Sequence, residues 1–505
     1  MRVKLTVLGI VLLGFTLRLW TIGNGIPHTT GTDEPVIMEK AVQIMRSGDL
    51  NPHFFDYGGL TIYLQMAVAS LRFAAGALSR EWTSLDRVWE GDFYLWARTT
   101  TALLGTFLIY VVYRIGLRWN IAVALIAALM MAIHPHLVRE SHYALTDTPL
   151  TFLLALTLLL SLVAAEDGRL RWFLLAGVTA GLATATKYNG SLGLLLPLCA
   201  AVSPTVRLRT AAMVTAGLGL VGGFLVTSPY SLLDLPEFLN AFALLAQHYN
   251  QPGSAMEGAE IYIKHIRLGF GLGLAGRWSA LLGLPAVVFC LVGLVSLFSQ
   301  LFSRARRAQA LILLVFPLVY FWMIAQQSLI YARYALPLAP VLCLSLAIGL
   351  TTVHQRLDAT VSAPRRRRQV LVALLLVVAI PPAVQAISFD FERRKVGTEE
   401  LMAQWLQKNI RPEDRIIIES PTIRLPPGFH YEYHARLIQR PVEEYRAKGV
   451  VYLVLDSGKF NEAMRSPGEV AGYRALFAST EMIKTIPKTD DHPGPTLTVL
   501  RIPKQ

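Results

Sequence analysis

Long apolar runs dominate this sequence, and short gaps that carry arginine or lysine separate many of them. A run of roughly 20 apolar residues forms a helix that crosses the hydrocarbon core of a bilayer. Hydrophobic residues make up 53% of the 505 residues and charged residues only 16%, a composition that is too apolar for a soluble protein. The chain is therefore predicted to be a polytopic α-helical membrane protein.

The distribution of basic residues argues against a nucleic-acid-binding protein, and the positions of the cysteines argue against a disulfide-rich protein. The formal net charge is +13, but the basic residues stand in gaps between apolar runs, whereas nucleic-acid binding needs them clustered on a folded face. The three cysteines, Cys199, Cys290 and Cys343, all lie inside apolar runs. A disulfide framework is therefore not expected.

The positive-inside rule predicts the topology. Arg2 and Lys4 precede the first apolar run, which predicts a cytoplasmic N-terminus and, because no clear cleavage site follows, a retained helix. The later basic gaps are predicted to be cytoplasmic as well: Arg114 and Arg118, Arg169 and Arg171, Arg207 and Arg209, Arg304, Arg306 and Arg307, and 365–368.

The same rule decides the role of the moderately apolar stretch 60–78. If this stretch crossed the membrane, every later basic gap would move to the outside, so we expect a helix that lies in the outer interface. The other runs predict about eleven spans, near residues 5–22, 99–117, 120–135, 148–165, 172–187, 189–203, 210–228, 279–302, 309–325, 335–353 and 369–389. The first extracytoplasmic loop is then 23–97.

This topology gathers the unusual polar segments on the outer side of the membrane. They are the loop 23–97, "HPHLVRESHYALTD" (134–147), "TKYNG" (186–190), the loop 229–278, "QQSLIYARY" (326–334) and the tail from about 390. The cytoplasmic side carries mostly arginine. This asymmetry predicts an active site at the outer membrane surface.

The tail differs in kind from the rest of the chain. "TEELMAQWLQKNI" and "EVAGYRALFAS" have the spacing of helices, and "DRIIIES" and "GVVYLVLDS" are typical of strands. Roughly 110 residues suffice for a small α/β domain with its own core. We therefore expect two domains, a transmembrane domain over 1–389 and a soluble extracytoplasmic α/β domain over 390–505.

Five motifs follow one another in a recognisable order: "DE" after the first helix, "FFD" before the interfacial helix, "HPHLVRESHYALTD", "GLATATKYNG" and "YARYALPLAP". Over roughly residues 1–390 this order resembles the GT-C glycosyltransferases, within them the group of protein O-mannosyltransferases and lipid A aminoarabinose transferases. The resemblance implies a transfer, usually with inversion, of a sugar from a polyprenyl-phosphate carrier to an extracytoplasmic lipid, glycan or protein hydroxyl. The tail carries no recognisable carbohydrate module, which favours a bacterial relative over a eukaryotic protein mannosyltransferase and so predicts the plasma membrane of a bacterium.

By match to the first-loop motif of this group, Asp33 in "GTDEPVIMEK" is the candidate general base that deprotonates the acceptor. Glu34 is its neighbour and is predicted to orient the acceptor or to tune the pKa of Asp33. The residues by themselves also fit a helix start, because Pro35 suits a first helical position and acids there complement the helix dipole. The two interpretations are compatible.

A departing lipid phosphate needs cations near the outer interface. Arg98, Lys187 and Arg333 stand near the predicted outer ends of spans, and together with Tyr331 they are the candidates for binding the donor phosphate. The alternative is that the basic side chains only snorkel to water or to lipid phosphate without binding a substrate.

Two further carboxylates are candidates for orienting a substrate. Asp147, at the start of a predicted span, could orient one of the cations or a sugar hydroxyl, or could cap its own helix. Asp56 resembles an aspartate that precedes a proline pair in the family. This chain departs from that pattern, because Gly58 and Gly59 stand where prolines are common.

His134, His136 and His142, with Glu140 among them, raise the question of a metal site. Their spacing fits no standard zinc site, and a lipid-phosphate leaving group does not demand a metal. We therefore expect no metal and no cofactor, although the sequence leaves a divalent cation open. His142 remains a third candidate for orienting a substrate.

Two other classes of function fit a polytopic membrane protein. A transporter or lipid flippase would place ionisable groups along a pathway through the membrane, but the sequence shows no inverted repeat and few charges within the spans. A non-catalytic membrane scaffold that presents the tail would leave the grouping of Asp33, Lys187 and Arg333 unexplained.

Overall fold

The computed structural model describes residues 2–31, 33–249, 276–327, 331–358, 364–464 and 467–503. The chain separates into two compact units. The first comprises Met1–Trp20, Gln43–Ser70 and Ala97–Phe389, and the second comprises Thr21–Val42, Leu71–Trp96 and Asp390–Gln505.

The first unit is a bundle of long helices. Its principal helices are α1 (Arg2–Leu19), α4 (Tyr94–Gly116), α5 (Ile121–Ala132), α7 (Asp147–Asp167), α8 (Leu170–Thr186), α10 (Arg209–Thr227), α14 (Gly276–Gln300), α15 (Arg307–Ala325), α16 (Ala339–Asp358) and α17 (Pro364–Arg393). Shorter helical elements join them: α6 (Pro135–Glu140), η3 (Tyr188–Leu194), α9 (Leu195–Ala200), α11 (Tyr230–Leu233), α12 (Leu235–Tyr249) and η4 (Ala332–Leu338). The helices α2 (Glu34–Ser47) and α3 (Gly59–Leu78) contribute residues to both units.

Among the described residues, seven helical segments are long and apolar enough to cross a membrane: Gly59–Leu78, Tyr94–Gly116, Asp147–Asp167, Arg209–Thr227, Arg307–Ala325, Ala332–Leu357 and Arg365–Asn409. Three shorter apolar helices are Ile121–Ala132, Leu170–Thr186 and Pro285–Gln300. The prediction of a multi-pass membrane protein is confirmed. The predicted count of about eleven spans also included α1, which carries three basic residues, and the run 189–203.

The run 189–203 does not form the continuous α-helix that its apolar composition predicts. A 3₁₀ segment, η3, is followed by only one and a half turns of α-helix in α9. Gly190 explains part of this, because a Cβ atom there would lie 2.3 Å from the carbonyl group of Ala183 in α8. The segment therefore follows the backbone of α8 closely, as only glycine permits.

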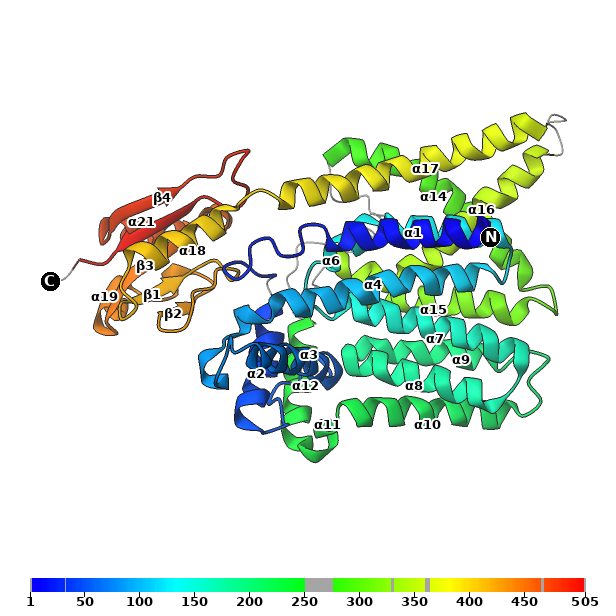
Figure 1. Ribbon diagram of the computed structural model, residues 1–505, viewed down its shortest axis with the longest axis horizontal. Coiled ribbons are helices and arrows are strands. Elements are labelled where there is room, and N and C mark those ends of the chain that lie inside the picture. The colour runs from blue at the N-terminus through cyan, green and yellow to red at the C-terminus, as the bar shows by residue number, and fades with distance from the viewer. Residues whose placement is uncertain are drawn as a thin grey trace. The chain divides into compact units, whose positions relative to one another are not determined.

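The connections that carry basic residues and the segments between α5 and α7 and between α8 and η3 lie at opposite ends of the bundle (Figure 1). The N-terminus and the connections from α4 to α5 and from α7 to α8, which carry the basic gaps, lie at one end. The segments between α5 and α7 and between α8 and η3 lie at the other end. α3 is foreshortened in this view, so its axis departs from the direction that α7, α8 and α10 share. Because Gly59–Leu78 is also long and apolar enough to cross a membrane, the interfacial placement of 60–78 stays a prediction.

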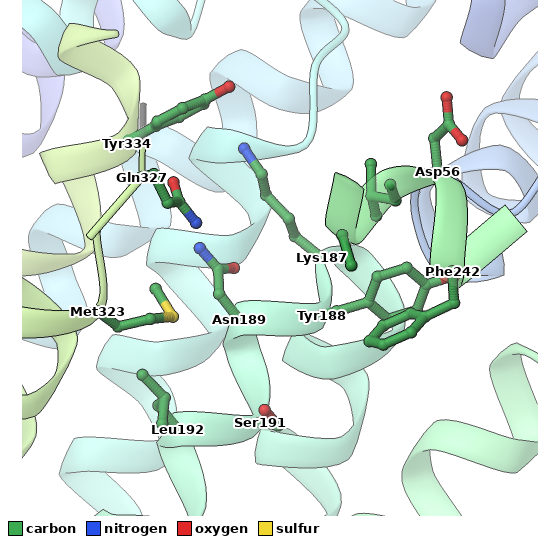
Figure 2. A pocket seen from close by; sticks show the side chains of 12 residues that line it. Asp56, Lys187, Tyr188, Asn189, Ser191, Leu192, Phe242, Met323, Gln327 and Tyr334 are labelled. Atoms are coloured by element: carbon green, nitrogen blue, oxygen red, sulfur yellow. The ribbon is translucent and has the colours of Figure 1, made fainter. Parts of the chain in front are cut away.

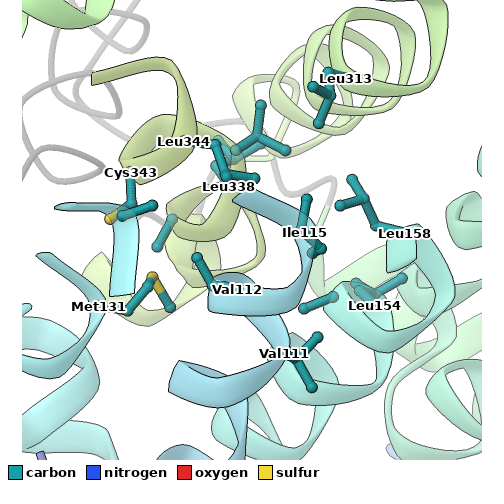
Figure 3. Packing of buried hydrophobic residues seen from close by; sticks show 14 of the residues in the cluster. Val111, Val112, Ile115, Met131, Leu154, Leu158, Leu313, Leu338, Cys343 and Leu344 are labelled. Carbon is teal, nitrogen blue, oxygen red and sulfur yellow. The ribbon is translucent and has the colours of Figure 1, made fainter. Parts of the chain in front are cut away.

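Apolar side chains fill the interior of the bundle (Figure 3). They come from α4, α5, α7, α15, η4 and α16, and include Val111, Val112, Ile115, Met131, Leu154, Leu158, Leu313, Leu338, Cys343 and Leu344. Elsewhere small residues bring helices together. A Cβ atom at Gly177 of α8 would lie 2.1 Å from the carbonyl oxygen of Ala216 in α10, and one at Gly219 of α10 would lie 2.6 Å from that of Leu174. Glycine at both positions lets the two backbones touch.

The second unit contains the predicted C-terminal α/β fold. Its strands are β1 (Arg415–Ile418), β2 (His430–Tyr433), β3 (Val450–Asp456), β4 (Glu481–Ile486) and β5 (Leu497–Arg501), in the order β2-β1-β3-β5-β4. β1 is parallel to β2 and β3, whereas β5 is antiparallel to β3 and β4. Helical elements accompany the sheet: α18 (Thr398–Asn409), η5 (Leu437–Gln439), α19 (Val442–Ala447), α20 (Ser457–Ala463) and α21 (Pro467–Ala478).

The two compact units group the chain differently from the two expected domains. Both divisions separate the chain after residue 389, but two parts of the first loop, Thr21–Val42 and Leu71–Trp96, cluster with the tail rather than with the helix bundle. The second part includes η1 (Leu85–Arg87) and η2 (Glu90–Asp92).

Candidate active site

The buried carboxylate of Asp147 collects two cations within the first unit. Asp147 begins α7, and only 4% of its side chain is exposed. The Nζ atom of Lys187 lies 3.0 Å from Oδ1 of Asp147, and Nε of Arg333 lies 3.7 Å from Oδ2. We call these three residues the Asp147 cluster. One buried carboxylate therefore lies close to two cations.

Aromatic rings support both cations of the cluster. Lys187 follows the end of α8 in an extended conformation, and its Nζ atom lies 4.5 Å from the ring centre of Tyr334. The guanidinium carbon of Arg333 lies 4.9 Å from the ring centre of Tyr331 and 5.9 Å from that of Tyr334. An aromatic face attracts a cation but leaves its charge available to an anion.

A pocket of about 280 Å³ opens beside Lys187 (Figure 2). It is lined by Asp56, Lys187, Tyr188, Asn189, Ser191, Leu192, Phe242, Leu245, Ala246, Met323, Gln327 and Tyr334. In Figure 2, Lys187, Asn189 and Gln327 point toward one another, while Tyr188 and Phe242 form another side of the pocket. The mixture of charged, polar and apolar walls suits a ligand with a polar head and an apolar body.

Hydrogen bonds hold the polar walls of this pocket. Asn189 donates from Nδ2 to the hydroxyl oxygen of the buried Tyr320, at 2.9 Å. Tyr188 donates from its hydroxyl to the carbonyl oxygen of Phe55, at 2.7 Å. The second bond ties η3 to the segment that carries Asp56. The pocket is therefore built from side chains whose positions are set by buried partners.

Glu140 adds a titratable group within electrostatic range of the Asp147 cluster. Burial raises the pKa of the Glu140 carboxyl to about 7. The positive charge of Arg139, whose Nε atom lies 3.6 Å from Oε1 of Glu140, opposes this rise, whereas the negative charge of Asp147 adds to it. Lys187 and Arg333 lower it as well. The negative charge near the two cations therefore changes around neutral pH.

Asp33 and Glu34 lie in the second unit, where α2 begins. Asp33 is a partly exposed turn residue, and Glu34, the first residue of α2, is fully buried. Oε2 of Glu34 accepts a hydrogen bond from the peptide N–H of Gly31 at 2.6 Å, and the Glu34 N–H donates to the Gly31 carbonyl at 3.2 Å. The helix-start interpretation therefore applies to Glu34, and Asp33 is the more accessible carboxylate.

Arg98 lies near the start of α4, at the predicted end of its span. It is fully buried on α4, and its guanidinium carbon lies 5.7 Å from the ring centre of Tyr143. Its side chain does not reach water in this structure, and its role in binding the donor phosphate stays a prediction. Tyr331, in contrast, is exposed and packs against Arg333.

His142 makes main-chain contacts through both ring nitrogens. Nδ1 lies 2.8 Å from the carbonyl oxygen of Val138, and Nε2 lies 2.8 Å from that of Trp20. The ring also packs edge-on against Phe389, with ring centres 5.3 Å apart. These contacts favour a structural role that joins α1 to α6, and the predicted substrate-orienting role stays a prediction.

Within the part of the chain that the structure describes, His53, Asp234 and Glu237 place their ligand atoms within 4.8 Å of one another. Nδ1 of His53 lies 3.0 Å from Oε2 of Glu237, and Nε2 lies 3.3 Å from Oδ2 of Asp49. Hydrogen bonds to Glu237 and Asp49 raise the pKa of His53 above its ordinary value. The group is thus satisfied as an ion-paired network, and its residue types could also bind zinc. Neither His134 nor His136 belongs to it.

One family model matches part of this chain. Residues 63–203, less than half of the chain, match the family model of dolichyl-phosphate-mannose-protein mannosyltransferases. Asp147 and Lys187 fall inside the match, whereas Asp33 and Arg333 fall outside it. No curated protein matches the chain in sequence.

Solved structures match over nearly the whole chain. ArnT from Cupriavidus metallidurans in the apo state is 16% identical with a TM-score of 0.61, and the match covers 99% of this chain and 97% of ArnT. ArnT bound to undecaprenyl phosphate is 16% identical with a TM-score of 0.59 and the same coverage. The oligosaccharyltransferase of Archaeoglobus fulgidus is 13% identical with a TM-score of 0.56, over 90% of this chain and 69% of the oligosaccharyltransferase.

The chain has the GT-C fold. The predictions of the GT-C fold and of a small C-terminal α/β domain are confirmed, and the partial family match supports the predicted class of glycosyltransferase.

Some residues of this candidate site were not singled out from the sequence. Asn189 lies in "TKYNG", next to Tyr188 and close to the predicted Lys187, and Gln327 lies in "QQSLIYARY", which also holds the predicted Tyr331 and Arg333. Both segments therefore carried the signal, although other residues in them were chosen. Tyr320 offered a different signal, a hydroxyl inside an apolar run. Such a hydroxyl needs a hydrogen-bond partner when it is buried. That partner, Asn189, depends on the packing of α15 against η3.

Proposed function

We propose that this protein is an integral membrane glycosyltransferase that transfers a sugar from a polyprenyl-phosphate carrier to a hydroxyl group of an extracytoplasmic lipid, glycan or protein. The observation that carries this proposal is the Asp147 cluster beside an amphipathic pocket. Lys187, which lines the pocket, and Arg333 share one buried carboxylate, and an aromatic ring packs against each cation. A transporter gains no comparable support.

The cluster suits the phosphate of a lipid-linked sugar. Asp147 holds the two cations in place before a ligand arrives, so little reorganisation is needed when a phosphodiester binds. Charge-assisted hydrogen bonds from lysine and arginine to phosphate are among the strongest in proteins. The ArnT structure with undecaprenyl phosphate supports the choice of a polyprenyl phosphate as carrier.

Asp33 is the proposed general base. In the proposed step the acceptor hydroxyl gives its proton to the Asp33 carboxylate while the acceptor oxygen forms a bond to the anomeric carbon of the sugar. The bond between that carbon and the phosphate oxygen breaks, and its electron pair leaves on the phosphate. Lys187 and Arg333 stabilise the additional negative charge. Attack opposite the phosphate inverts the anomeric configuration.

No metal takes part in this proposed step. The phosphate is already a leaving group, and protein cations stabilise it. We expect that a chelator such as EDTA leaves the transfer rate unchanged. Loss of transfer with EDTA and its recovery with zinc would contradict this part of the proposal and would direct attention to His53, Asp234 and Glu237.

The proposed location is the bacterial plasma membrane, with the pocket and the C-terminal domain on the extracytoplasmic side. This orientation follows from the positive-inside rule, because the basic gaps lie at one end of the bundle and the Asp147 segment at the other (Figure 1).

The test uses purified full-length protein and a panel of radiolabelled polyprenyl-phosphate sugars. We expect one donor to lose its label to an acceptor or to water in the presence of the wild-type protein. Asp33→Asn keeps the size of the side chain but removes the base, so transfer should fall by at least about 10²-fold while the carrier lipid still binds.

Glu34→Gln, the same kind of substitution at the neighbouring carboxylate, is the matched control for Asp33→Asn. It should reduce transfer less, because Glu34 accepts a hydrogen bond that the Gln amide oxygen can also accept. Near-normal transfer by Asp33→Asn would disprove the role of Asp33 as base. A wild-type protein that acts on no lipid-linked sugar would disprove the proposed function itself.

A further inference from the structure

A short antiparallel pairing joins the first loop to the C-terminal domain within the second unit. Thr29 and Ile423 form an isolated antiparallel bridge. The peptide N–H of Thr30 donates to the carbonyl oxygen of Thr422 at 3.2 Å, and the N–H of Arg424 donates to the carbonyl oxygen of His28 at 2.8 Å. Two segments nearly 400 positions apart in sequence thus lie side by side.

The C-terminal side of this pairing is firmly anchored. Ile423 and Leu425 are buried in the core that α18 forms with the sheet. Glu399, in the first turn of α18, accepts hydrogen bonds from the hydroxyls of Ser420 and Thr422, the first at 2.7 Å. The segment that meets the first loop is therefore part of the rigid body of the domain.

The first-loop side of the pairing leads directly to the proposed base. Thr30 is buried, and Asp33 follows three positions later. After the turn, Glu34 closes back onto Gly31 through two hydrogen bonds. The backbone on either side of Asp33 is thus held, by the C-terminal domain before it and by the start of α2 after it.

Two further contacts support the same junction. Asn24 donates from Nδ2 to the carbonyl oxygen of Arg393 at 2.6 Å. Arg424 acts electrostatically on Glu39 of α2: partial burial raises the pKa of Glu39, Glu90 adds to the rise, and Arg424 opposes it. The C-terminal domain therefore contacts the loop before Asp33 through the main chain and the helix after it through charge.

We infer that the segment Thr422–Arg424 of the C-terminal domain positions the catalytic loop, so that the domain sets the location of the Asp33 carboxylate. This inference rests on the proposed function of Asp33. It assigns the soluble domain a part in the transfer step itself, in addition to any contact with an acceptor. A base displaced by about 1 Å can lose roughly 10²-fold in rate, so a rigid support for Asp33 has a direct catalytic effect.

A cross-link tests the pairing in the full chain. The pattern of hydrogen bonds makes Thr29 and Ile423 a non-hydrogen-bonded pair, in which Cα atoms lie about 4.5 Å apart. A disulfide spans Cα distances of about 4.4 to 6.8 Å. We expect Thr29→Cys/Ile423→Cys to form the disulfide on mild oxidation and to keep the wild-type kcat once oxidised. The two single-cysteine variants are the controls.

Arg424→Pro in the double-cysteine background tests the catalytic consequence. Proline removes the N–H that bonds to His28, so the reduced protein should lose roughly 10- to 100-fold in kcat. The KM for the donor should stay within about twofold, because Lys187 and Arg333 belong to the first unit. Oxidation should restore kcat, since the disulfide replaces the lost bond. Arg436→Ala, which changes an ion-paired arginine elsewhere in the same domain, should leave kcat unchanged.

Each outcome separates this inference from the proposed function. Failure of the cross-link, wild-type kcat in the reduced Arg424→Pro variant, or no recovery on oxidation would each disprove the positioning role while leaving the transferase proposal intact. A merely structural defect would not be reversed by one disulfide. If the wild-type protein transfers no sugar, the proposed function fails, and the positioning role fails with it.

Discussion

Asp147 lies close to two cations, Lys187 and Arg333, and this arrangement leads to a prediction about the donor. Lys187→Ala and Arg333→Ala should each weaken donor binding by roughly 10- to 150-fold, the equivalent of about 1.5 to 3 kcal/mol for a charge-assisted contact to phosphate. Arg333→Lys should restore only part of the affinity, because the planar fork of hydrogen-bond donors is lost. Binding of a labelled polyprenyl-phosphate sugar to the protein in detergent measures this.

The matched control for these variants is Arg171→Ala. Arg171 is also a basic residue that pairs with an aspartate, Asp167, but it lies on a cytoplasmic gap of the predicted topology and is largely exposed. Donor binding should not change. If donor binding is unchanged in both Lys187→Ala and Arg333→Ala, these side chains do not bind the donor, and the snorkelling interpretation holds for them.

Glu140 predicts a pH dependence of donor binding. Its pKa is raised to about 7, so its carboxyl is neutral at pH 6 and charged at pH 8. A phosphodiester keeps one negative charge over this range. The new charge on Glu140 weakens the attraction of Lys187 and Arg333 for the donor, so affinity should fall as the pH rises through about 7. Glu140→Gln should flatten this profile, and an equally steep profile in that variant would exclude Glu140 as its cause.

The same ionisation affects stability. Because the folded-state pKa of Glu140 lies above the ordinary value of 4.5, the folded protein binds more protons than the unfolded chain between these two values. The contribution of Glu140 to the free energy of unfolding therefore decreases as the pH rises from about 4.5 to about 7. Glu140→Gln removes this contribution at every pH.

At the scale of helices, the contact between α8 and α10 depends on residues without side chains. Gly219→Leu should push α10 away from α8, because even a Cβ atom at this position would lie 2.6 Å from the Leu174 carbonyl oxygen. Overpacking of this kind costs typically about 1 to 3 kcal/mol. Thermal unfolding in detergent should show a lower midpoint for this variant.

Gly222→Leu provides the control on the same helix. A Cβ atom there meets nothing within 4 Å among the described residues, so the midpoint should stay near that of the wild type. Equal midpoints for the two variants would show that α10 does not need its close contact with α8.

At the scale of the whole molecule, the topology can be tested from both sides of the membrane. Thr83→Cys, at an exposed position after α3, should react with a membrane-impermeant thiol reagent on intact cells. Arg366→Cys, within the basic run 365–368, should react only after the membrane is permeabilised. Reaction of Thr83→Cys only from the cytoplasmic side would mean that 60–78 crosses the membrane, and every predicted extracytoplasmic position would then be reversed.

The sequence predicted the helices well because membrane spanning leaves a strong local signal. Hydrophobic length and basic gaps are properties of contiguous residues, and ten of the predicted spans correspond to α1, α4, α5, α7, α8, α10, α14, α15, α16 and α17. The run 189–203 was wrong for a tertiary reason, since the close approach of Gly190 to α8 cannot be seen in hydropathy.

Sequence patterns alone determined that this chain is a multi-pass membrane protein with a small α/β tail. They also singled out Asp147, Lys187 and Arg333, with Asp147 as a candidate to orient one of the cations. The tertiary structure decided that these three form one ion-paired cluster, that Arg98 is buried away from water, and that residues 28–30 pair with 422–424. The physical reason is range. Hydropathy and charge asymmetry act along neighbouring residues, whereas an ion pair or a strand pairing depends on distances between segments that only packing brings together.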